Sequence, residues 1–267
     1  MSNGAETWFT RFRSCPTPRA RLICLPFAGG SSSIYRRWHL FLPDWVDVCA
    51  VELPGRARRQ QEPLCVDMAQ VVDGLANAIK ESSPVPYFLF GHSLGALIAF
   101  ATAQALQRTG VTPARHLFVS GRIAPQSGNP DQAVGSMTDA ELVTMLRNRG
   151  GTPPEVLNEP ELMARCLPVI RADFRLLNSY RYEPSGALLV PLSIFGGTRD
   201  SRATEADLQA WRNHTDKDAR VRMFAGDHFF ISSAANEVVF VVAQTITAAI
   251  TGVPVGRPHE LFALRSL

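Results

Sequence analysis

One stretch of the sequence decides the fold of the chain: Tyr87-Phe88-Leu89-Phe90-Gly91-His92-Ser93-Leu94-Gly95-Ala96-Leu97-Ile98-Ala99-Phe100. Its first four residues follow Val85-Pro86 and predict a buried strand of a parallel sheet, and residues 96–106 are typical of a helix packed on that sheet. Between them lies Gly-X-Ser-X-Gly, the nucleophile-elbow pattern. Ser93 is then expected at the tip of a tight strand-to-helix turn, in a strained backbone conformation that holds its hydroxyl out of the sheet.

Two glycines and one helix end support this prediction. A side chain at Gly91 or Gly95 would collide with the neighbouring strand or helix. The helix that follows points the positive end of its dipole at Ser93, which favours negative charge developing there. The alternative is an ordinary serine in a glycine-rich turn. The buried strand before the motif and the alanine-rich helix after it are, however, the context that the chemistry requires.

The composition describes a globular chain that is neither disordered nor membrane-spanning. The chain has 267 residues, of which 46% are hydrophobic and 19% charged. This length can bury a large core, and we expect a single domain over residues 1–267. No apolar run approaches the ~20 residues that span a bilayer. The net charge of +3 argues against a dedicated nucleic-acid binder.

The cysteines and the N-terminus favour a cytoplasmic protein. The five cysteines are scattered, without a Cys-X-X-Cys pair, which predicts neither a disulfide framework nor a zinc site. Residues 1–6 lack the basic and apolar segments of a secretory signal. We therefore expect a reduced, cytoplasmic setting.

Strands and helices alternate along most of the chain. Strands are predicted at residues 8–12, 21–25, 47–53, 87–90, 116–119, 188–195 and 220–224, and helices at residues 31–42, 68–80, 96–106, 204–213 and 234–251. This alternation implies parallel pairing with right-handed crossovers. We expect an α/β fold with a mostly parallel central sheet and helices on both faces. The tail from Val253 to Leu267 is expected to be poorly ordered.

The alternation breaks between about residues 127 and 182, where the pattern is helical without strands. Helices are predicted at residues 139–147 and 159–180, each with one apolar face, and Pro168 should kink or divide the second. An ordinary packed helical pair is one interpretation. We favour an inserted helical lid whose apolar residues roof a pocket above Ser93, because loops inserted on this type of sheet usually build the site.

A serine hydroxyl is a poor nucleophile and needs a base within hydrogen-bond reach. Of the six histidines, His228 is the predicted general base. It lies in Ala225-Gly226-Asp227-His228-Phe229-Phe230, directly after a late strand, at the carboxyl edge where such sheets bind ligands. His92 lies inside the elbow and points away from Ser93, so we predict a structural role for it.

The third catalytic member must accept a hydrogen bond from the other imidazole nitrogen. Asp200 ends the turn Phe195-Gly196-Gly197-Thr198-Arg199-Asp200, at the carboxyl end of another strand. Asp227 is adjacent to the histidine and badly placed to reach it, and Asp173 lies in the predicted lid. The order along the chain, nucleophile then acid then base, is the order expected of an α/β-hydrolase.

Two backbone N–H groups should complete the site as an oxyanion hole. One belongs to Leu94, immediately after the nucleophile. The other comes from the loop after the strand at residues 21–25, where Pro26 has no N–H, so the donor is Ala28 or, one step earlier, Phe27. The two glycines that follow let this backbone approach a substrate closely.

One basic cluster, Arg56-Ala57-Arg58-Arg59, has two interpretations. A solvated loop is the simpler one, since most surface charge runs only solubilise a protein. The other is a docking patch for an acidic partner or a phosphate.

The sequence resembles the stand-alone type II thioesterases associated with polyketide synthases and non-ribosomal peptide synthetases. Together with the helical insertion, the matching motifs cover residues 21–250. Many relatives have Met in place of Leu94, but the backbone donates there, so the difference leaves the mechanism intact. Four motifs match in order: Leu25-Pro26-Phe27-Ala28-Gly29-Gly30-Ser31, Leu53-Pro54-Gly55-Arg56, Gly91-His92-Ser93-Leu94-Gly95-Ala96 and Gly226-Asp227-His228-Phe229.

The resemblance implies an α/β-hydrolase that clears wrong or stalled acyl groups from the phosphopantetheine arm of an acyl or peptidyl carrier protein, through an acyl-enzyme on Ser93. It also implies a mainly monomeric, cytoplasmic enzyme without a cofactor. Two alternatives stay open. A small-molecule esterase or lipase would have the same triad, and a non-catalytic binding protein of this fold would normally lack one of its members.

Overall fold

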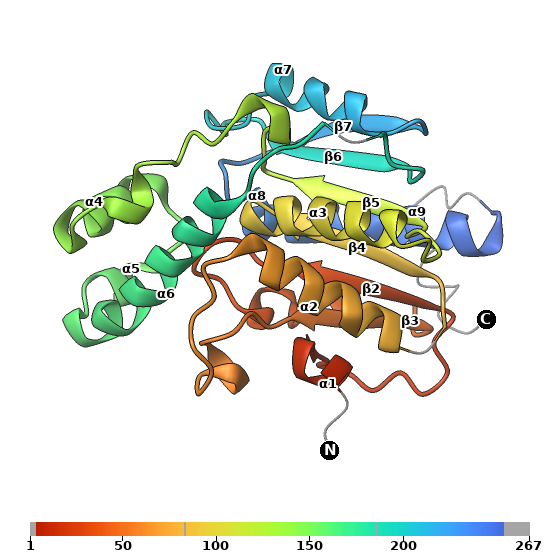
Figure 1. The fold of residues 1–267 in the computed structure, drawn as a ribbon, viewed down its shortest axis with the longest axis horizontal. Coiled ribbons are helices and arrows are strands. Elements are labelled where there is room, and N and C mark those ends of the chain that lie inside the picture. The colour runs from red at the N-terminus through yellow and green to blue at the C-terminus, as the bar shows by residue number, and fades with distance from the viewer. Residues whose placement is uncertain (1–3, 83, 185, 254–267) are drawn as a thin grey trace.

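The centre of the molecule is a mostly parallel β-sheet (Figure 1). A computed structural model describes residues 4–82, 84–184 and 186–253. Within these residues seven strands lie in the order β1-β3-β2-β4-β5-β6-β7, and every neighbouring pair is parallel except β1 with β3. The strands are β1 (Phe9–Thr10), β2 (Ala20–Leu25), β3 (Val46–Val51), β4 (Tyr87–His92), β5 (His116–Ser120), β6 (Leu192–Gly197) and β7 (Ala219–Phe224).

Burial along the strands follows their place in the sheet. β2 and β3 are buried at every residue, as expected for central strands that are covered on both faces. β7 pairs with β6 and forms one rim of the sheet. Exposed Arg220 and Arg222 alternate there with partly buried Val221 and Met223, the period-two pattern of a strand with one face toward water.

Helices cover both faces of the sheet, as predicted (Figure 1). Each face has its own buried cluster, one through Phe100 and Trp211 and the other through Tyr35 and Trp38. The first face carries α1 (Gly4–Trp8), α2 (Met68–Glu81), α3 (Leu94–Arg108) and α7 (Glu205–Leu208), and the second carries α8 (Phe230–Ser233) and α9 (Ala235–Thr251).

The insertion between β5 and β6 is helical and lies beyond one end of the sheet (Figure 1). It contains α4 (Asp139–Arg149), α5 (Pro154–Leu157) and α6 (Pro160–Ser179), with 3-10 turns η4 (Pro125–Ser127) and η5 (Val134–Ser136) before them. The Thr138 hydroxyl and the Glu141 side chain form a capping box at the start of α4. α6 runs through Pro168 as one helix, so of the two predicted effects of this proline, a kink or a division, the division does not occur.

Four predicted segments differ from the structure in extent or type. In place of the helix at residues 31–42 are two 3-10 turns, η1 (Ser32–Tyr35) and η2 (Trp38–Leu40), because serines are weak helix formers and the Tyr35 hydroxyl is fixed by donating to the Leu25 carbonyl at 2.6 Å. The strand predicted at residues 188–195 begins only after Pro191, which has no N–H to donate.

The other two differences concern the length of an element. α7 covers only part of the predicted helix at residues 204–213 and continues as the 3-10 turn η6 (Gln209–His214). The strand predicted at residues 8–12 is present only as the two residues of β1. One further 3-10 turn, η3 (Ala57–Arg59), lies in the predicted basic cluster. The expectation for the tail from Val253 to Leu267 falls outside the described residues from 254 onward.

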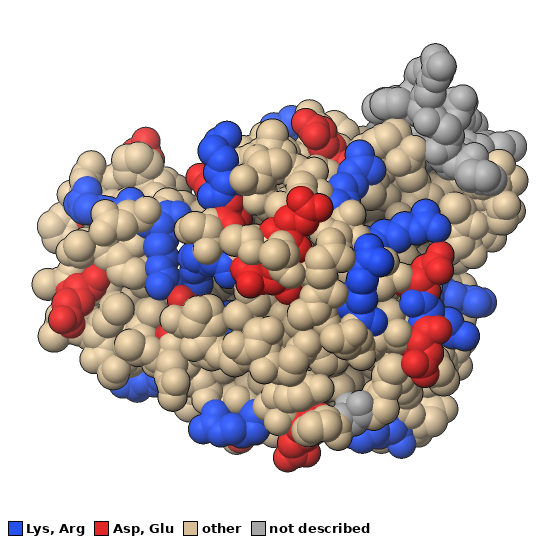
Figure 2. Space-filling view, turned by 90° about the horizontal axis from the view of Figure 1, so that it is seen from above, with Lys and Arg blue, Asp and Glu red and all other residues tan. Residues whose placement is uncertain are grey.

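Charged side chains of both signs are interspersed on the face of the molecule seen in Figure 2. None of the described helices is long and apolar enough to cross a membrane.

Candidate active site

The turn between β4 and α3 presents Ser93 in a conformation that few residues adopt. Its backbone has φ 55° and ψ −113°, which is strained for a residue with a side chain. A Cβ atom added at Gly91 would lie 2.1 Å from the Gly95 carbonyl oxygen, and one added at Gly95 would lie 2.2 Å from the Leu25 carbonyl oxygen. The close approach of strand, turn and helix thus explains both glycines of the motif, as the sequence predicted.

Three side chains that are far apart in the sequence form one hydrogen-bonded chain. His228 Nε2 lies 3.1 Å from Ser93 Oγ, and His228 Nδ1 lies 2.7 Å from Asp200 Oδ2. All three residues are buried, with 9%, 7% and 5% of their surface exposed for Ser93, His228 and Asp200. The structure therefore brings together the three residues that the sequence singled out.

The neighbours of Asp200 and His228 leave this chain undisturbed. The Arg202 backbone N–H donates to Asp200 Oδ1 at 3.0 Å, which holds the carboxylate in the turn after β6. Asp227 accepts from the Phe229 backbone N–H at 2.8 Å and does not bind the imidazole beside it, in agreement with the sequence argument. Asp173, the other aspartate considered, has a different set of partners.

His92 lies beside His228 and contacts its backbone. Its Nε2 lies 2.9 Å from the His228 carbonyl oxygen and its Nδ1 lies 2.8 Å from Ser120 Oγ. A carbonyl can only accept, so Nε2 carries the proton and the Ser120 hydroxyl donates to Nδ1. Burial, reinforced by the nearby His228, holds the pKa of His92 well below its usual value, which keeps the ring neutral. Its contacts are those of a structural residue.

The loop after β2 offers a backbone N–H to the same site. The Gly29 N–H donates to Asp173 Oδ2 at 2.7 Å, and the Gly30 N–H donates to the Phe27 carbonyl at 2.8 Å. Within the described residues, the N–H of Ala28 has no acceptor among protein groups. Ala28 and Leu94 line one cavity together with Ser93 and His228. A two-donor oxyanion hole requires two such N–H groups beside the reacting serine.

A buried ion pair holds this loop in place. Arg56 donates to Asp173 through both terminal nitrogens, at 2.6 and 2.7 Å, and also donates to the Gly30 carbonyl at 3.0 Å. Asp173 has no exposed surface and Arg56 is 7% exposed. Asp173 on α6 and Arg56 after β3 therefore bind the loop on two sides, at Gly29 and at Gly30.

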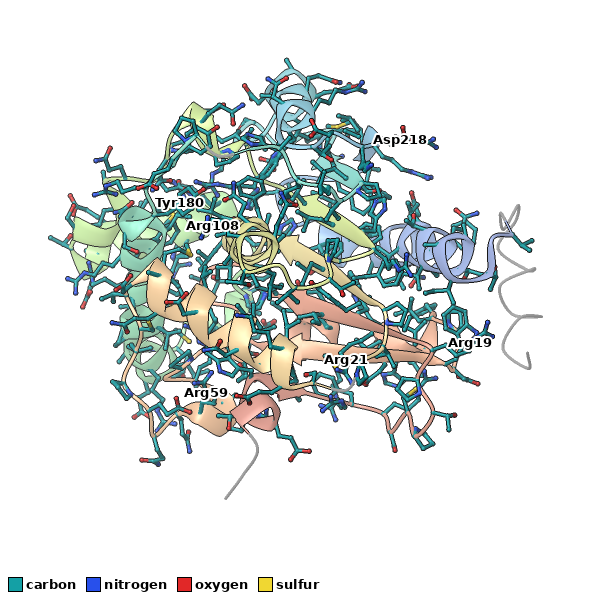
Figure 3. All side chains as sticks on the ribbon, turned by 45° about the vertical axis from the view of Figure 1, so that its right-hand side comes forward. Arg19, Arg21, Arg59, Arg108, Tyr180 and Asp218 are labelled. Carbon is teal, nitrogen blue, oxygen red and sulfur yellow. The ribbon has the colours of Figure 1, made fainter. Side chains whose placement is uncertain are left out.

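These contacts test the two interpretations of the basic cluster at residues 56–59. Arg59, which is labelled in Figure 3, is buried and donates to both carboxylate oxygens of Glu62 at 2.6 and 2.7 Å. Its guanidinium lies over the Trp8 ring of α1. Arg58 is exposed, but its guanidinium donates to three backbone carbonyls at residues 6, 7 and 9. Arg56 and Arg59 are engaged within the fold, so neither a solvated loop nor a docking patch describes them. Arg58 is exposed, and a docking role for it stays a prediction.

The sequence interpretation missed the role of Asp173, although a signal for it was present. Ile170, Phe174 and Leu177 mark the apolar face of α6, and Asp173 lies on that same face at helical spacing. A charged residue in the middle of an apolar stripe must be paired, and such a residue is a candidate for a specific buried partner.

The cavity above Ser93 is small and is roofed by the insertion. Its volume is about 40 Å³, far below the ~300–1,000 Å³ of typical ligand pockets. α4 and α6 contribute the apolar side chains Met145, Leu146, Phe174 and Leu177, and a charged group from Asp131, Arg149 and Arg202 forms another part of the wall. The described residues contain no cluster of three or more His, Cys, Asp or Glu side chains that could hold a metal ion.

Comparison with known proteins gives a consistent result. A family model described as "Thioesterase domain" matches residues 20–248. The gramicidin S biosynthesis protein GrsT of Aneurinibacillus migulanus is 37% identical over 233 residues, which cover 87% of this chain and 91% of GrsT. Thioesterase PikA5 of Streptomyces venezuelae is 34% identical over 238 residues, which cover 86% of this chain and 82% of PikA5.

The solved structures agree with the sequence comparison. The type II thioesterase BorB from the borrelidin biosynthetic cluster superposes with a TM-score of 0.82 at 34% identity, covering 90% of this chain and 98% of BorB. The family model covers most of the chain, and the relatives match it over nearly their whole length. The chain therefore belongs to the thioesterase family, and it is a thioester hydrolase with the α/β-hydrolase fold.

Proposed function

We propose that this thioesterase removes acyl groups from the phosphopantetheine arm of an acyl or peptidyl carrier protein in a polyketide or non-ribosomal peptide assembly line, through an acyl-enzyme on Ser93. The observation that carries the mechanism is the hydrogen-bonded chain from Ser93 through His228 to Asp200. The choice of substrate is supported by the relatives, among them a gramicidin S biosynthesis protein and a type II thioesterase from the borrelidin cluster.

In the first half of the reaction, His228 Nε2 accepts the Ser93 proton as Oγ attacks the thioester carbonyl. Asp200 accepts from Nδ1, so it fixes the tautomer of the ring and stabilises the imidazolium. The N–H groups of Leu94 and Ala28 bind the oxyanion of the tetrahedral intermediate. A thiol with a pKa of about 8.5 leaves readily, so collapse of the intermediate needs little acid assistance. The imidazolium gives its proton to the departing sulfur, which returns His228 to its neutral form for the second half.

In the second half, a water molecule takes the place of the departed thiol. His228 removes a proton from this water as it attacks the acyl-serine, and the same two N–H groups bind the new oxyanion. Ser93 regains its proton from the imidazolium and the carboxylic acid is released. The enzyme needs no cofactor for either half.

The insertion at about residues 127–182 acts as a lid in this proposal. Phe229 follows the base directly and packs on Gly151, where an added Cβ atom would lie only 2.1 Å from the ring. The chamber beneath α4 and α6 is too small for a long acyl chain as it stands, so we expect the lid to move when such a chain enters. We further propose a single-domain, monomeric enzyme in the cytoplasm.

An esterase or lipase acting on small oxygen esters would use the same three side chains. The comparison that separates the two activities is the rate on an oxygen ester and on a thioester of the same acyl group. We expect a clear preference for the thioester, and a preference for the oxygen ester would contradict the proposal.

A serine-reactive fluorophosphonate probe tests the nucleophile. The intact protein should be labelled, and Ser93→Ala should lose both the labelling and thioester hydrolysis, with a fall in kcat of about 10⁴-fold or more. Ser136→Ala is the matched control, because Ser136 is exposed and lies in η5 of the insertion. Labelling of Ser93→Ala at the level of the intact protein would show that another residue is the nucleophile.

A further inference from the structure

Three arginines surround one aspartate at the wall of the Ser93 cavity. Asp131 Oδ1 lies 2.9 Å from Arg149 Nη1, and Asp131 Oδ2 contacts Arg202 and lies 3.9 Å from Arg122. Arg122 follows β5, Arg149 is the last residue of α4, and Arg202 lies in the turn after β6. The cluster therefore joins the insertion to the sheet at a point next to the nucleophile.

The positive charge of this cluster exceeds its negative charge. Within the part of the chain that the structure describes, the ion pairs of all three arginines go to Asp131. The carboxylate of Asp200 is close by, but His228 and a backbone N–H already bind it. The side chain of Arg122 is 6% exposed, and its Nε atom is buried without a hydrogen-bond partner among the described residues. Three guanidinium groups thus share one carboxylate.

Burial lowers the pKa of two of these arginines, although the Asp131 carboxylate opposes the shift. Burial lowers the pKa of Arg122 to about 10, and the charge of Arg202 acts in the same direction. Burial is also the main cause that lowers the pKa of Arg202, and the charge of Arg149 adds to it. Both groups remain charged at neutral pH, so an anion placed beside them would be stabilised.

Part of this cluster faces the substrate chamber. Asp131, Arg149 and Arg202 line the same cavity as Ser93 and His228. The side chains of Arg149 and Arg202 keep about a quarter of their surface exposed, at 25% and 23%. A short chain attached at Ser93 therefore meets apolar side chains of α4 and α6 on one part of the wall and guanidinium donors on another.

We propose that the acyl pocket accepts short acyl groups that carry a terminal carboxylate, which Arg149 and Arg202 bind. This inference rests on the proposed function, because it assigns the acyl substrate of the same site. A carboxylate can receive two parallel N–H bonds from a guanidinium, and such charge-assisted bonds are stronger than neutral ones.

The phosphate of the pantetheine arm is the other anion that could reach the protein. It lies at the far end of the arm from the sulfur, whereas Arg149 and Arg202 share a cavity of about 40 Å³ with Ser93 itself. The carboxylate of a short acyl group stays close to the reacting carbonyl, so the geometry favours the acyl group as the source of the anion.

The test compares acyl groups of equal carbon number, with and without a terminal carboxylate. Malonyl is compared with propionyl and glutaryl with valeryl, all as N-acetylcysteamine thioesters, which carry no phosphate. For at least one pair we expect kcat/KM to be about 10–100-fold higher for the carboxylate, the range expected of a charge-assisted hydrogen bond. If none of the four thioesters is hydrolysed, the result counts against the proposed thioesterase mechanism itself.

Variants of the intact protein assign the preference to the cluster. Arg149→Met should lower the ratio of the two kcat/KM values by about 10-fold or more, and Arg149→Lys should retain part of the preference. Arg165→Met is the matched control: Arg165 is an exposed residue of α6 outside the cavity, and the ratio should not change.

Three results would overturn the inference. In the first, the wild type shows no preference for either carboxylate. In the second, Arg149→Met keeps the preference while the midpoint of its unfolding transition falls, and the cluster then only stabilises the packing of α4. In the third, Arg149→Met would raise KM for phosphopantetheine thioesters of all acyl groups and leave the N-acetylcysteamine ratios unchanged. The anion would then be the phosphate of the arm.

Discussion

Asp173 connects the helical insertion to the loop after β2 through a single carboxylate. It has no exposed surface, so its charge must be balanced inside the protein. Arg56 supplies the opposite charge, and Oδ2 of the Asp173 carboxylate also accepts from the Gly29 N–H. The neighbouring N–H, that of Ala28, is the one that the proposed mechanism assigns to the oxyanion. The Arg56–Asp173 ion pair thus fixes the loop that carries the Ala28 N–H, although Ala28 is not part of that pair.

We expect Asp173→Asn to slow the chemical step more than it weakens substrate binding. The amide keeps an oxygen for Gly29 but leaves the buried Arg56 charge without a counter-charge, so the loop loses its fixed position. The expected fall in kcat is about 10–100-fold, somewhat less than the ~10²–10³-fold that follows loss of a whole oxyanion donor, with little change in KM. Steady-state kinetics on one thioester measure both constants.

A boronic acid that forms a tetrahedral adduct with Ser93 separates positioning from simple destabilisation. Its affinity should fall by about the same factor as kcat, because both report binding of the oxyanion. Asp139→Asn is the control, since Asp139 is an exposed aspartate of the same insertion, paired with Arg171. A variant with a lowered unfolding temperature but an unchanged kcat would contradict a positioning role.

At the scale of elements, the turn from β4 into α3 permits almost no change. We expect Gly95→Ala to destabilise the protein by at least about 3 kcal/mol or to prevent folding, because the added methyl would lie 2.2 Å from a backbone carbonyl of β2, which cannot rotate away. The free energy of unfolding in urea is the measurement. Gly186→Ala is the matched control, because nothing lies within 4 Å of its Cβ position. Equal stability of the two variants would refute the steric argument.

The elements that local chemistry dictates were predictable from the sequence. Ser93 and its two glycines follow from a steric rule about one turn. α2 was predicted at residues 68–80 and observed as Met68–Glu81, because its apolar spacing is a local signal. Ser93, Asp200 and His228 each follow a strand, and this position predicted their meeting, because parallel strands end at one edge of the sheet.

What the sequence did not reveal depends on contacts between distant residues. Arg56 and Asp173 are 117 positions apart, and nothing in the local pattern of either residue names the other. The same holds for Asp131 and its three arginines. The two 3-10 turns η1 and η2 escaped prediction for a related reason, because the Tyr35 hydroxyl is held by a carbonyl of β2 rather than by helical neighbours. Tertiary contacts override propensity at such places.

At the scale of the whole molecule, buried neutral histidines make stability depend on pH. Burial, with a smaller effect of the Arg220 charge, lowers the pKa of His116 from 6.5 to about 4. The unfolded chain therefore binds more protons than the folded chain between these values, so stability is complete above pH 6.5 and is lost as pH falls toward 4. His92, whose pKa is also lowered by burial, acts in the same direction.

We expect His116→Gln to reduce this acid sensitivity. The contribution of His116 to the loss of unfolding free energy between pH 8 and pH 5 is about 2 kcal/mol, and the variant should lose that much less than the wild type. Urea unfolding at both pH values is the measurement. The difference at pH 8 reports the lost hydrogen bond to Ser193 and packing alone, so it serves as the internal control. Parallel pH profiles of the two proteins would contradict the assignment.

The exposed rim at β7 has a consequence for how copies of this chain meet. An unpaired edge strand presents a row of backbone donors and acceptors that another chain could extend into a continuous ribbon. Arg220 and Arg222 stand along this strand with their side chains in water. Two such strands placed side by side would bring like charges together, which is repulsive across a sheet. The two arginines thereby oppose aggregation through this edge in a crowded solution, while the backbone of β7 still pairs with β6.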